Sequence, residues 1–173
     1  MTLNPVPPRV RILSIPFEGG ESNELGDGEN PVLSPTGDRV AFVKNGQIWT
    51  APITGSAPAR QLFAARGTNS DPRWSPDGSR LAFVADRGDH AFVGVYTGDS
   101  TRIFWLDPAF ARDRSPRWSP DGKSIAFVRL PAAGGEPDSI LVRRHNPRDR
   151  LAVVAGVRHG DVALAGARDP RGR

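Results

Sequence analysis

The sequence contains no cysteine, which excludes both a disulfide framework and a thiolate zinc site. Its three histidines, His90, His145 and His159, are too scattered along the chain to indicate a metal cluster. The first twenty residues have neither a basic start nor an apolar run, and no later stretch is long and apolar enough to span a membrane. We therefore expect no signal peptide, no transmembrane segment, no metal and no cofactor, with a cytoplasmic location by default.

Lysine is almost absent, with two lysines among the 23 basic residues. The net charge of +4 comes from residues 143–173, whose eight arginines and three aspartates leave residues 1–142 at −1. A near-neutral body does not indicate a nucleic-acid or membrane partner. The arginine-rich tail is more typical of a solvated, poorly ordered segment than of a binding surface.

What the sequence does contain is a repeated motif. Residues 72–84 read Pro-Arg-Trp-Ser-Pro-Asp-Gly-Ser-Arg-Leu-Ala-Phe-Val, and residues 116–128 repeat them almost letter for letter. Residues 31–43 form a weaker copy, with leucine in place of tryptophan and threonine in place of aspartate. The Ser-Pro pairs are 41 and 44 residues apart, and a period in the low forties is typical of the blades of a β-propeller.

Each repeat can be divided into short strands separated by turns. Asn45-Gly46 is a two-residue hairpin signal, because both residues accept the positive φ of a type I′ turn. Residues 11–20 resemble 47–56, an apolar strand followed by proline and a glycine turn, so they should be part of a preceding blade. In the first full repeat we expect strands at 31–33, 39–44, 47–53 and 59–64. In the second, we expect a first strand that ends at residue 74, followed by strands at 80–85, 91–96 and 102–106. In the third, we expect a first strand that ends at residue 118, followed by strands at 124–129 and 139–142.

This pattern predicts an all-β fold, a β-propeller segment of about three four-stranded antiparallel blades plus a partial amino-terminal blade. It divides the chain into an amino-terminal segment at 1–30, three repeats at 31–142 and an atypical arginine-rich tail at 143–173. The boundaries of the three repeats are 31–70, 71–114 and 115–142. No aromatic residue follows Phe127, and a fourth motif is missing near residue 161, so the tail is not another blade of this kind.

The letters of the motif fit a tight turn. Proline presets φ for the second turn position, aspartate or threonine suits the third, glycine takes a positive φ, and the serine hydroxyl can bond to the turn backbone. A tryptophan just before the turn can fill the gap between blades. The residues assigned to this structural motif are Ser34, Pro35 and Gly37, then Trp74, Ser75, Pro76, Asp77 and Gly78, then Trp118, Ser119, Pro120, Asp121 and Gly122.

The strand after each turn is apolar on both faces. Leu81 and Phe83 point to one side, and Ala82 and Val84 to the other, which is typical of a strand sandwiched between neighbouring blades. The alternative that Asp77 and Asp121 are catalytic carboxylates or cation ligands is weaker. At equivalent repeat positions we expect them to lie tens of ångströms apart around the propeller.

Trp-Ser-Pro-Asp-Gly followed by a Leu/Ile-Ala-Phe strand resembles the WD40-like propeller repeat of two groups. One is the amino-terminal propeller of prolyl oligopeptidase family serine peptidases, of the dipeptidyl peptidase IV and acylaminoacyl-peptidase types, and the other is the TolB propeller. The resemblance covers about residues 11–142. The Asn45-Gly46-Gln47-Ile48-Trp49 hairpin and the run from Asn69 to Trp74 favour the peptidase group.

The resemblance implies peptide-bond cleavage by a serine–aspartate–histidine triad on an α/β-hydrolase domain. No Gly-x-Ser-x-Gly elbow occurs in this sequence, so we assign no catalytic residue, no cofactor and no metal ligand. The expected function is a non-catalytic, substrate-gating propeller that serves proteolysis as part of a full enzyme. Its partners would be further blades, a hydrolase domain and, in the full enzyme, a peptide substrate.

Two alternatives stay open at this point. The chain could be a TolB-like propeller that binds protein partners, or a truncated fragment without independent function. Three repeats and half of another fall short of the four to eight blades of a closed propeller, so we expect a longer parent protein. A truncated gene, or a reading frame that shifts near residue 143, would account for the loss of the pattern there.

Overall fold

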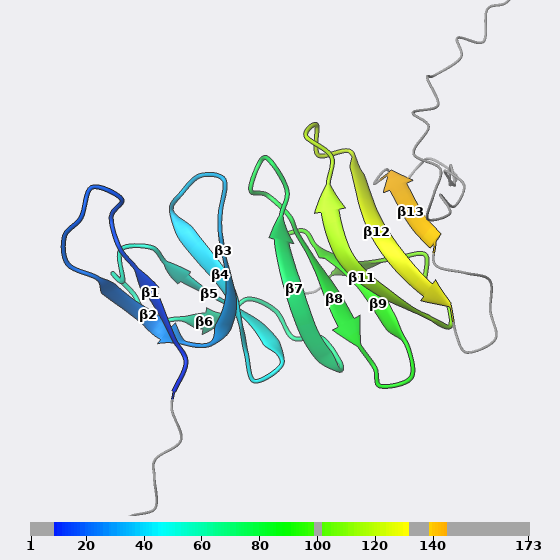
Figure 1. Cartoon of the computed structure of the whole chain (residues 1–173), viewed down its shortest axis with the longest axis horizontal. Helices are drawn as coiled ribbons and strands as arrows, with labels where there is room; N and C mark the ends of the chain where they lie inside the picture. Colours follow the sequence, from blue (N-terminus) through cyan, green and yellow to red (C-terminus); the bar gives the residue numbers. More distant parts are fainter. Residues whose placement is uncertain (1–8, 99–101, 132–138, 145–173) are drawn as a thin grey trace, which may run out of the picture.

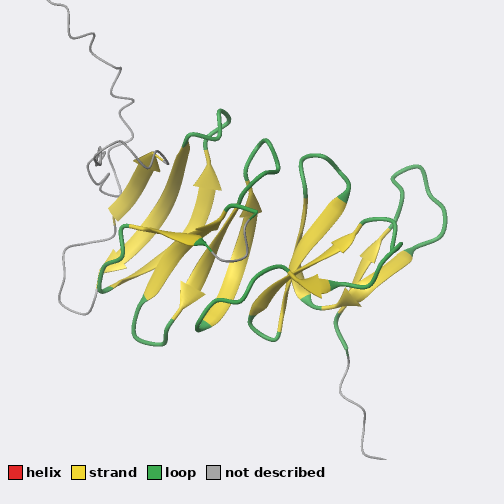
Figure 2. Ribbon diagram, turned by 180° about the vertical axis from the view of Figure 1, so that it is seen from behind, coloured by secondary structure: helices red, strands yellow, loops and turns green. Residues whose placement is uncertain are grey.

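The computed structural model describes residues 9–98, 102–131 and 139–144, and every regular element among them is a β-strand (Figure 2). β1 (Arg11–Ser14) and β2 (Asn23–Asp27) form a two-stranded sheet, here called the half-blade. The first blade contains β3 (Glu29–Leu33), β4 (Arg39–Lys44), β5 (Gln47–Pro52) and β6 (Arg60–Gln61). The second contains β7 (Thr68–Trp74), β8 (Leu81–Asp86), β9 (Ala91–Tyr96) and β10 (Ile103–Leu106), and the third contains β11 (Ala111–Trp118), β12 (Ser124–Pro131) and β13 (Ser139–Arg144).

The half-blade and the three blades follow one another in chain order across the molecule (Figure 1). Within each blade, consecutive strands pair antiparallel. One parallel pairing, Arg112 with Ala91, joins the third blade to the second as a continuous sheet. The first strands β3, β7 and β11 contact one another in turn, so they line the inner side of the row. The predicted all-β propeller segment is confirmed, and its described sheets do not close into a ring.

The Asn45-Gly46 hairpin is confirmed as a two-residue turn. Lys44 pairs with Gln47 across it, and φ is +51° at Asn45 and +66° at Gly46. Asparagine and glycine are the residues that occupy this left-handed region at least cost. This turn fixes the register of β4 against β5.

Two strands differ from the prediction. β2 was not predicted, because its residues, Asn-Glu-Leu-Gly-Asp, have little β-propensity of their own. The fourth strand of the first blade was predicted at 59–64 but is regular only over Arg60–Gln61. Leu62 still donates its N–H to the Ile48 carbonyl, and then Phe63 turns into the space between blades, so packing ends the strand.

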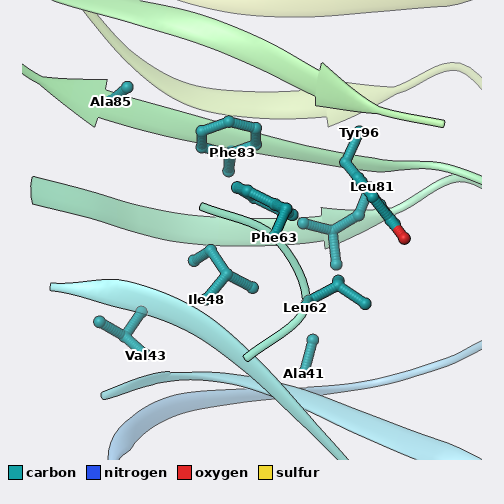
Figure 3. Packing of buried hydrophobic residues seen from close by; sticks show 9 residues of the cluster. All are labelled: Ala41, Val43, Ile48, Leu62, Phe63, Leu81, Phe83, Ala85 and Tyr96. Carbon is teal, nitrogen blue, oxygen red and sulfur yellow. The ribbon is translucent and has the colours of Figure 1, made fainter. Parts of the chain in front are cut away.

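The space between the first and second blades is filled by apolar side chains from both (Figure 3). The ring of Phe63 lies 4.6 Å from that of Phe83 and 5.1 Å from that of Tyr96, measured between centroids. Ala41 and Val43 come from the first blade, and Leu81 from the second. This is the sandwiched strand that the alternation of apolar residues predicts.

The same two faces recur at each boundary between sheets. In the strand after each turn, the larger apolar residues point to the preceding sheet. The alanine of that strand points to the following sheet, together with the apolar residue two positions after it, as Ala41 and Val43 do. Ile125 and Phe127 thus pack with Ala82, and Val40 and Phe42 pack with the half-blade. Because alanine is small, the neighbouring blade can approach closely enough for the large residues to be covered.

Candidate functional site: the row of motif turns

Each Ser-Pro motif forms a tight turn stabilised by the same backbone hydrogen bond. The glycine N–H donates to the serine carbonyl, at 2.9 Å for Gly37, 2.8 Å for Gly78 and 2.9 Å for Gly122. The three glycines have φ between +67° and +71°, a conformation that side-chain-bearing residues rarely adopt. The structure thus places all thirteen motif residues in or directly before these turns.

The serine hydroxyl is fully engaged within its turn. Ser75 Oγ accepts the N–H of Arg80 at 2.9 Å and lies 2.5 Å from Oδ1 of Asp77, to which it donates. Ser119 makes the matching contacts, accepting from Ser124 N–H at 2.9 Å and donating to Asp121 at 2.5 Å. In both turns the hydroxyl is held between a carboxylate and a backbone amide, so its hydrogen bonds stabilise the turn itself.

The turn carboxylates are held in the charged form. Hydrogen bonds from Ser75, then from Ser79, lower the pKa of Asp77 to about 2. The hydroxyl of Ser119 and the N–H of Lys123 lower the pKa of Asp121 in the same way. Catalytic acids and bases work best with a pKa near the ambient pH, so neither carboxyl is suited to proton transfer at neutral pH.

In the first turn, at residues 34–37, the carboxylate that accepts the serine hydroxyl comes from a different position, Asp38. Thr36 stands where the other turns have aspartate, but Asp38, two residues later, accepts hydrogen bonds from Ser34 at 2.8 Å and from Thr36. Hydrogen bonds from Arg39, Thr36 and Ser34 hold the pKa of Asp38 well below its usual range. The departure from the motif at Thr36 is therefore compensated within the turn.

The motif tryptophans tie each blade to the one before it. Trp118 Nε1 donates to the carbonyl of Arg73 at 2.9 Å, and Trp74 Nε1 donates to the carbonyl of Val32 at 3.3 Å. Arg73 and Val32 occupy the same place, two residues before the Ser-Pro pair. Both indole rings are half-buried at the boundary, so each fills the gap and also satisfies a backbone acceptor.

Successive turns touch one another, which corrects the expectation that Asp77 and Asp121 lie tens of ångströms apart. A Cβ built on Gly122 would stand 3.6 Å from Cδ of Pro76 and 3.5 Å from a guanidinium nitrogen of Arg80. Arg80 donates to the Gly122 carbonyl at 3.0 Å, and its guanidinium lies 4.9 Å from the centroid of the Trp118 ring. Neighbouring blades pack side by side, so equivalent turns form one continuous row.

Within the described residues, no group of three or more histidine or acidic side chains is arranged to hold a metal ion. His90 lies between aromatic rings, 4.6 Å from Phe92 and 5.7 Å from Phe110 between centroids. In the part of the chain that the structure covers, no helix could cross a membrane.

No family model matches the sequence. A 75-residue stretch is 37% identical to the uncharacterized peptidase YuxL of Bacillus subtilis strain 168, covering 36% of this chain and 11% of that protein. Among solved structures, a putative TolB from Agrobacterium tumefaciens has a TM-score of 0.61 at 20% identity, covering 78% of this chain and 53% of that one. The acylaminoacyl peptidase of Pyrococcus horikoshii has a TM-score of 0.54 at 20% identity, and the match covers 76% of this chain and 26% of the peptidase.

The chain is a β-propeller segment. Both groups indicated by the repeated motif, TolB and the prolyl oligopeptidase-type peptidases, are among its structural relatives, so the resemblance is confirmed for the fold. The propeller segment spans about half the length of the TolB chain and about a quarter of the acylaminoacyl peptidase.

A buried ion pair within the propeller was missed by the sequence interpretation. Arg129 bonds to Asp113 through two nitrogens, at 2.7 and 2.9 Å, and to a carboxylate oxygen and the carbonyl of Asp107 at 3.0 and 2.7 Å. The hydrogen bonds that Arg129 donates to Asp113 raise the pKa of the Arg129 guanidinium. Burial raises the pKa of Asp113, and the hydrogen bonds and positive charge of Arg129 oppose this shift. The pair lies far apart in sequence, and no local pattern marks it.

Asn69 occupies the position in the second blade that Asp113 has in the third. Its N–H donates to the carbonyl of Gly46 at 2.7 Å, and its side-chain amide donates to the carbonyl of Ala65 and to Oε1 of Gln47, both at 3.1 Å. The side chain is fully buried. This asparagine therefore anchors the second blade to the Asn45-Gly46 hairpin of the first.

Each inner strand also contains a β-bulge, which the sequence interpretation did not include. The register shifts fall between Glu29 and Val32, Ser70 and Arg73, and Arg114 and Arg117. Each bulge holds a non-glycine residue at φ between +51° and +55°, followed by proline: Asn30, Asp71 and Ser115. The recurring Asn/Asp/Ser-Pro dipeptide before the motif was the signal, since asparagine and aspartate tolerate the left-handed region best.

Proposed function

We propose that this chain is the non-catalytic propeller portion of a serine peptidase of the prolyl oligopeptidase family. In the full enzyme it would screen the active site of a hydrolase domain and admit substrates according to size. The single observation that carries the proposal is the 37% identity over 75 residues with a protein named as a peptidase. A cytoplasmic location is part of the same proposal.

Two further observations support a scaffold role in such an enzyme. Tricorn protease, prolyl endopeptidases and acylaminoacyl peptidases all contain a region that matches this fold. The matched region makes up no more than 27% of any of these chains. The motif serines and aspartates hydrogen-bond to each other within their own turns. The catalytic residues for peptide-bond cleavage would therefore come from another domain.

The test begins with the DNA that flanks this reading frame. We expect a Gly-x-Ser-x-Gly segment downstream, in one of the three frames, followed by a histidine-bearing hydrolase pattern. The protein encoded by the joined frame is then compared with a form that lacks residues 11–142. Removal of the propeller should raise cleavage of casein relative to cleavage of a short Ala-Pro p-nitroanilide peptide. Absence of the segment, or an unchanged ratio, would contradict the proposal.

A second candidate function is a TolB-like propeller that binds a protein partner. The TM-scores with two TolB proteins are both 0.61, and the chain covers 53% and 41% of those structures. This candidate predicts a signal peptide upstream and neighbouring genes for cell-envelope proteins. The flanking DNA therefore decides between the two.

A further inference from the structure

The surface that the first blade turns toward the half-blade is partly uncovered. Leu33 is 57% exposed and Ile15 is 63% exposed. They border a groove of about 530 Å³, which is lined by Leu13, Ile15, Pro31, Leu33, Val40 and Ile53, among others. We call this surface, together with Gly37 and the inner edge of β1, the amino-terminal face.

The same positions are covered at the two boundaries where one full blade meets another. Trp74 and Trp118, which correspond to Leu33, each donate to a carbonyl of the preceding blade. Gly78 has Pro35 next to it and Gly122 has Pro76, each 3.6 Å from a Cβ built on the glycine. A Cβ built on Gly37 meets no described atom within 4 Å. The amino-terminal face thus repeats the surface of an observed interface, but the described residues provide no hairpin that packs on Gly37.

The inner edge of β1 is the second part of this face. β1 corresponds to β5, because the turn after each closes with a glycine N–H on a proline carbonyl, Gly19 to Pro16 at 3.0 Å and Gly55 to Pro52 at 3.1 Å. β5 pairs on both edges, with β4 and β6. Among the described strands, β1 pairs with β2 alone. An unpaired edge is a template for another strand.

We propose that the amino-terminal face binds one β-hairpin that carries a Ser-Pro-x-Gly turn. The second strand of this hairpin adds antiparallel to the inner edge of β1, as β4 does to β5. The turn proline packs on Gly37, and the small residues of the hairpin cover Leu33 and Val40. This recognition combines main-chain pairing with a shaped apolar surface.

The hairpin of β11 and β12 shows what such a partner looks like. It contains the turn Ser119-Pro120-Asp121-Gly122, and Ala126 and Val128 on its outward side are half-exposed, whereas the equivalent Ala41 and Val43 are buried against the next blade. A hairpin of this kind presents to Leu33 the small-residue face that the first blade presents to the second.

The probe for the test is a synthetic peptide with the sequence of residues 111–131, labelled with a fluorophore and titrated with the full chain. Saturable binding is expected by anisotropy. Leu33→Trp restores the missing indole donor, which can reach the carbonyl of Arg117 in the probe, and should tighten binding about tenfold. Leu33→Lys should weaken binding by at least about tenfold, because it places a charge where apolar residues are buried.

The matched control is Phe110→Lys, which changes another exposed apolar residue, 68% exposed, in the connection between β10 and β11. It should leave binding of the probe unchanged, as a scrambled peptide should leave the anisotropy unchanged. Circular dichroism melting of each variant shows whether it is folded. The proposal is overturned if folded wild type does not bind the probe, if Leu33→Trp binds it no tighter, or if Phe110→Lys weakens it as much as Leu33→Lys. It is also overturned if sedimentation shows a dimer of the chain that Leu33→Lys abolishes and an excess of the probe does not dissociate, since a different surface of a second copy is then the occupant.

Discussion

The indole nitrogen of Trp118 donates a hydrogen bond to the backbone carbonyl of Arg73, 2.9 Å away, across the boundary between the second and third blades. The same bond joins Trp74 to Val32 at the boundary before it. A residue identified in the sequence as filler for a gap therefore also acts as a directional link. Each link joins the same two positions, so each of these two blades is bonded to the one before it at an equivalent point.

Replacement of Trp118 by phenylalanine tests this link. Phe keeps most of the ring but has no N–H, so the Arg73 carbonyl loses its donor, and we expect a loss of about 1–2 kcal/mol in the free energy of unfolding. Urea unfolding followed by circular dichroism measures it. The matched control is Trp49→Phe, since Trp49 Nε1 is buried without a hydrogen-bond partner among the described residues. Equal losses in the two variants would show that ring size, and not the hydrogen bond, carries the effect.

The buried ion pair gives a second prediction. Asp113→Asn leaves the guanidinium of Arg129, whose side chain is 14% exposed, without its main charge partner. Breaking a buried pair in this way costs about 3–5 kcal/mol of stability. Glu24→Gln removes the exposed pair with Arg11, whose side chains are 53% and 59% exposed, and should cost less than about 1 kcal/mol. Chemical denaturation of both variants at one pH makes the comparison, and similar midpoints would refute a structural role for the Asp113–Arg129 pair.

Acid should destabilise the propeller through its turns. The pKa of Asp77 is lowered to about 2 in the folded chain, from 3.8, by its hydrogen bonds. A carboxyl with a depressed folded-state pKa adds stability that is present above the unfolded pKa and is lost as the pH falls through the folded value. The urea midpoint should therefore fall between about pH 4 and pH 2.

Asp77→Asn should reduce that dependence on pH, because the amide does not titrate. Glu18→Gln, which removes a carboxylate from an exposed turn, is the control and should leave the slope as in the wild type. A pH profile that is the same for Asp77→Asn and the wild type would mean that other groups govern acid unfolding.

A close contact inside the second blade predicts the effect of one added methyl group. A Cβ on Gly94 would lie 2.7 Å from Phe83 and 2.9 Å from Trp105, and the φ of Gly94 is not in the left-handed region. Gly94→Ala should therefore destabilise the chain by about 1–3 kcal/mol through overpacking. The double variant with Phe83→Leu makes room for the methyl group, so its loss should be smaller than the sum of the two single losses. Additive losses in thermal melting would disprove this packing conflict.

The features that the sequence predicted are local ones. The type I′ turn at Asn45-Gly46, the Ser-Pro turns and the two apolar faces of the strand at Leu81 each depend on residues a few positions apart. The missed features join distant residues, such as Arg129 with Asp113, or Trp118 with Arg73, and no local periodicity reports such contacts. Thr36 illustrates a third case, since the carboxylate of the motif was present but displaced to Asp38.

The alternation of large and small residues on the second strand of each blade has a consequence for assembly. Phe83 faces backward along the row and Ala82 faces forward. The same holds for Phe42 with Ala41, and Phe127 also faces backward. The row therefore has a polarity, and its contacts are heterologous, joining unlike surfaces. Two copies related by a two-fold axis would bring like faces together, phenylalanine side to phenylalanine side. Each further blade would therefore pack on the row in the same orientation. Only a closed ring would leave no blade face of such a polar row exposed.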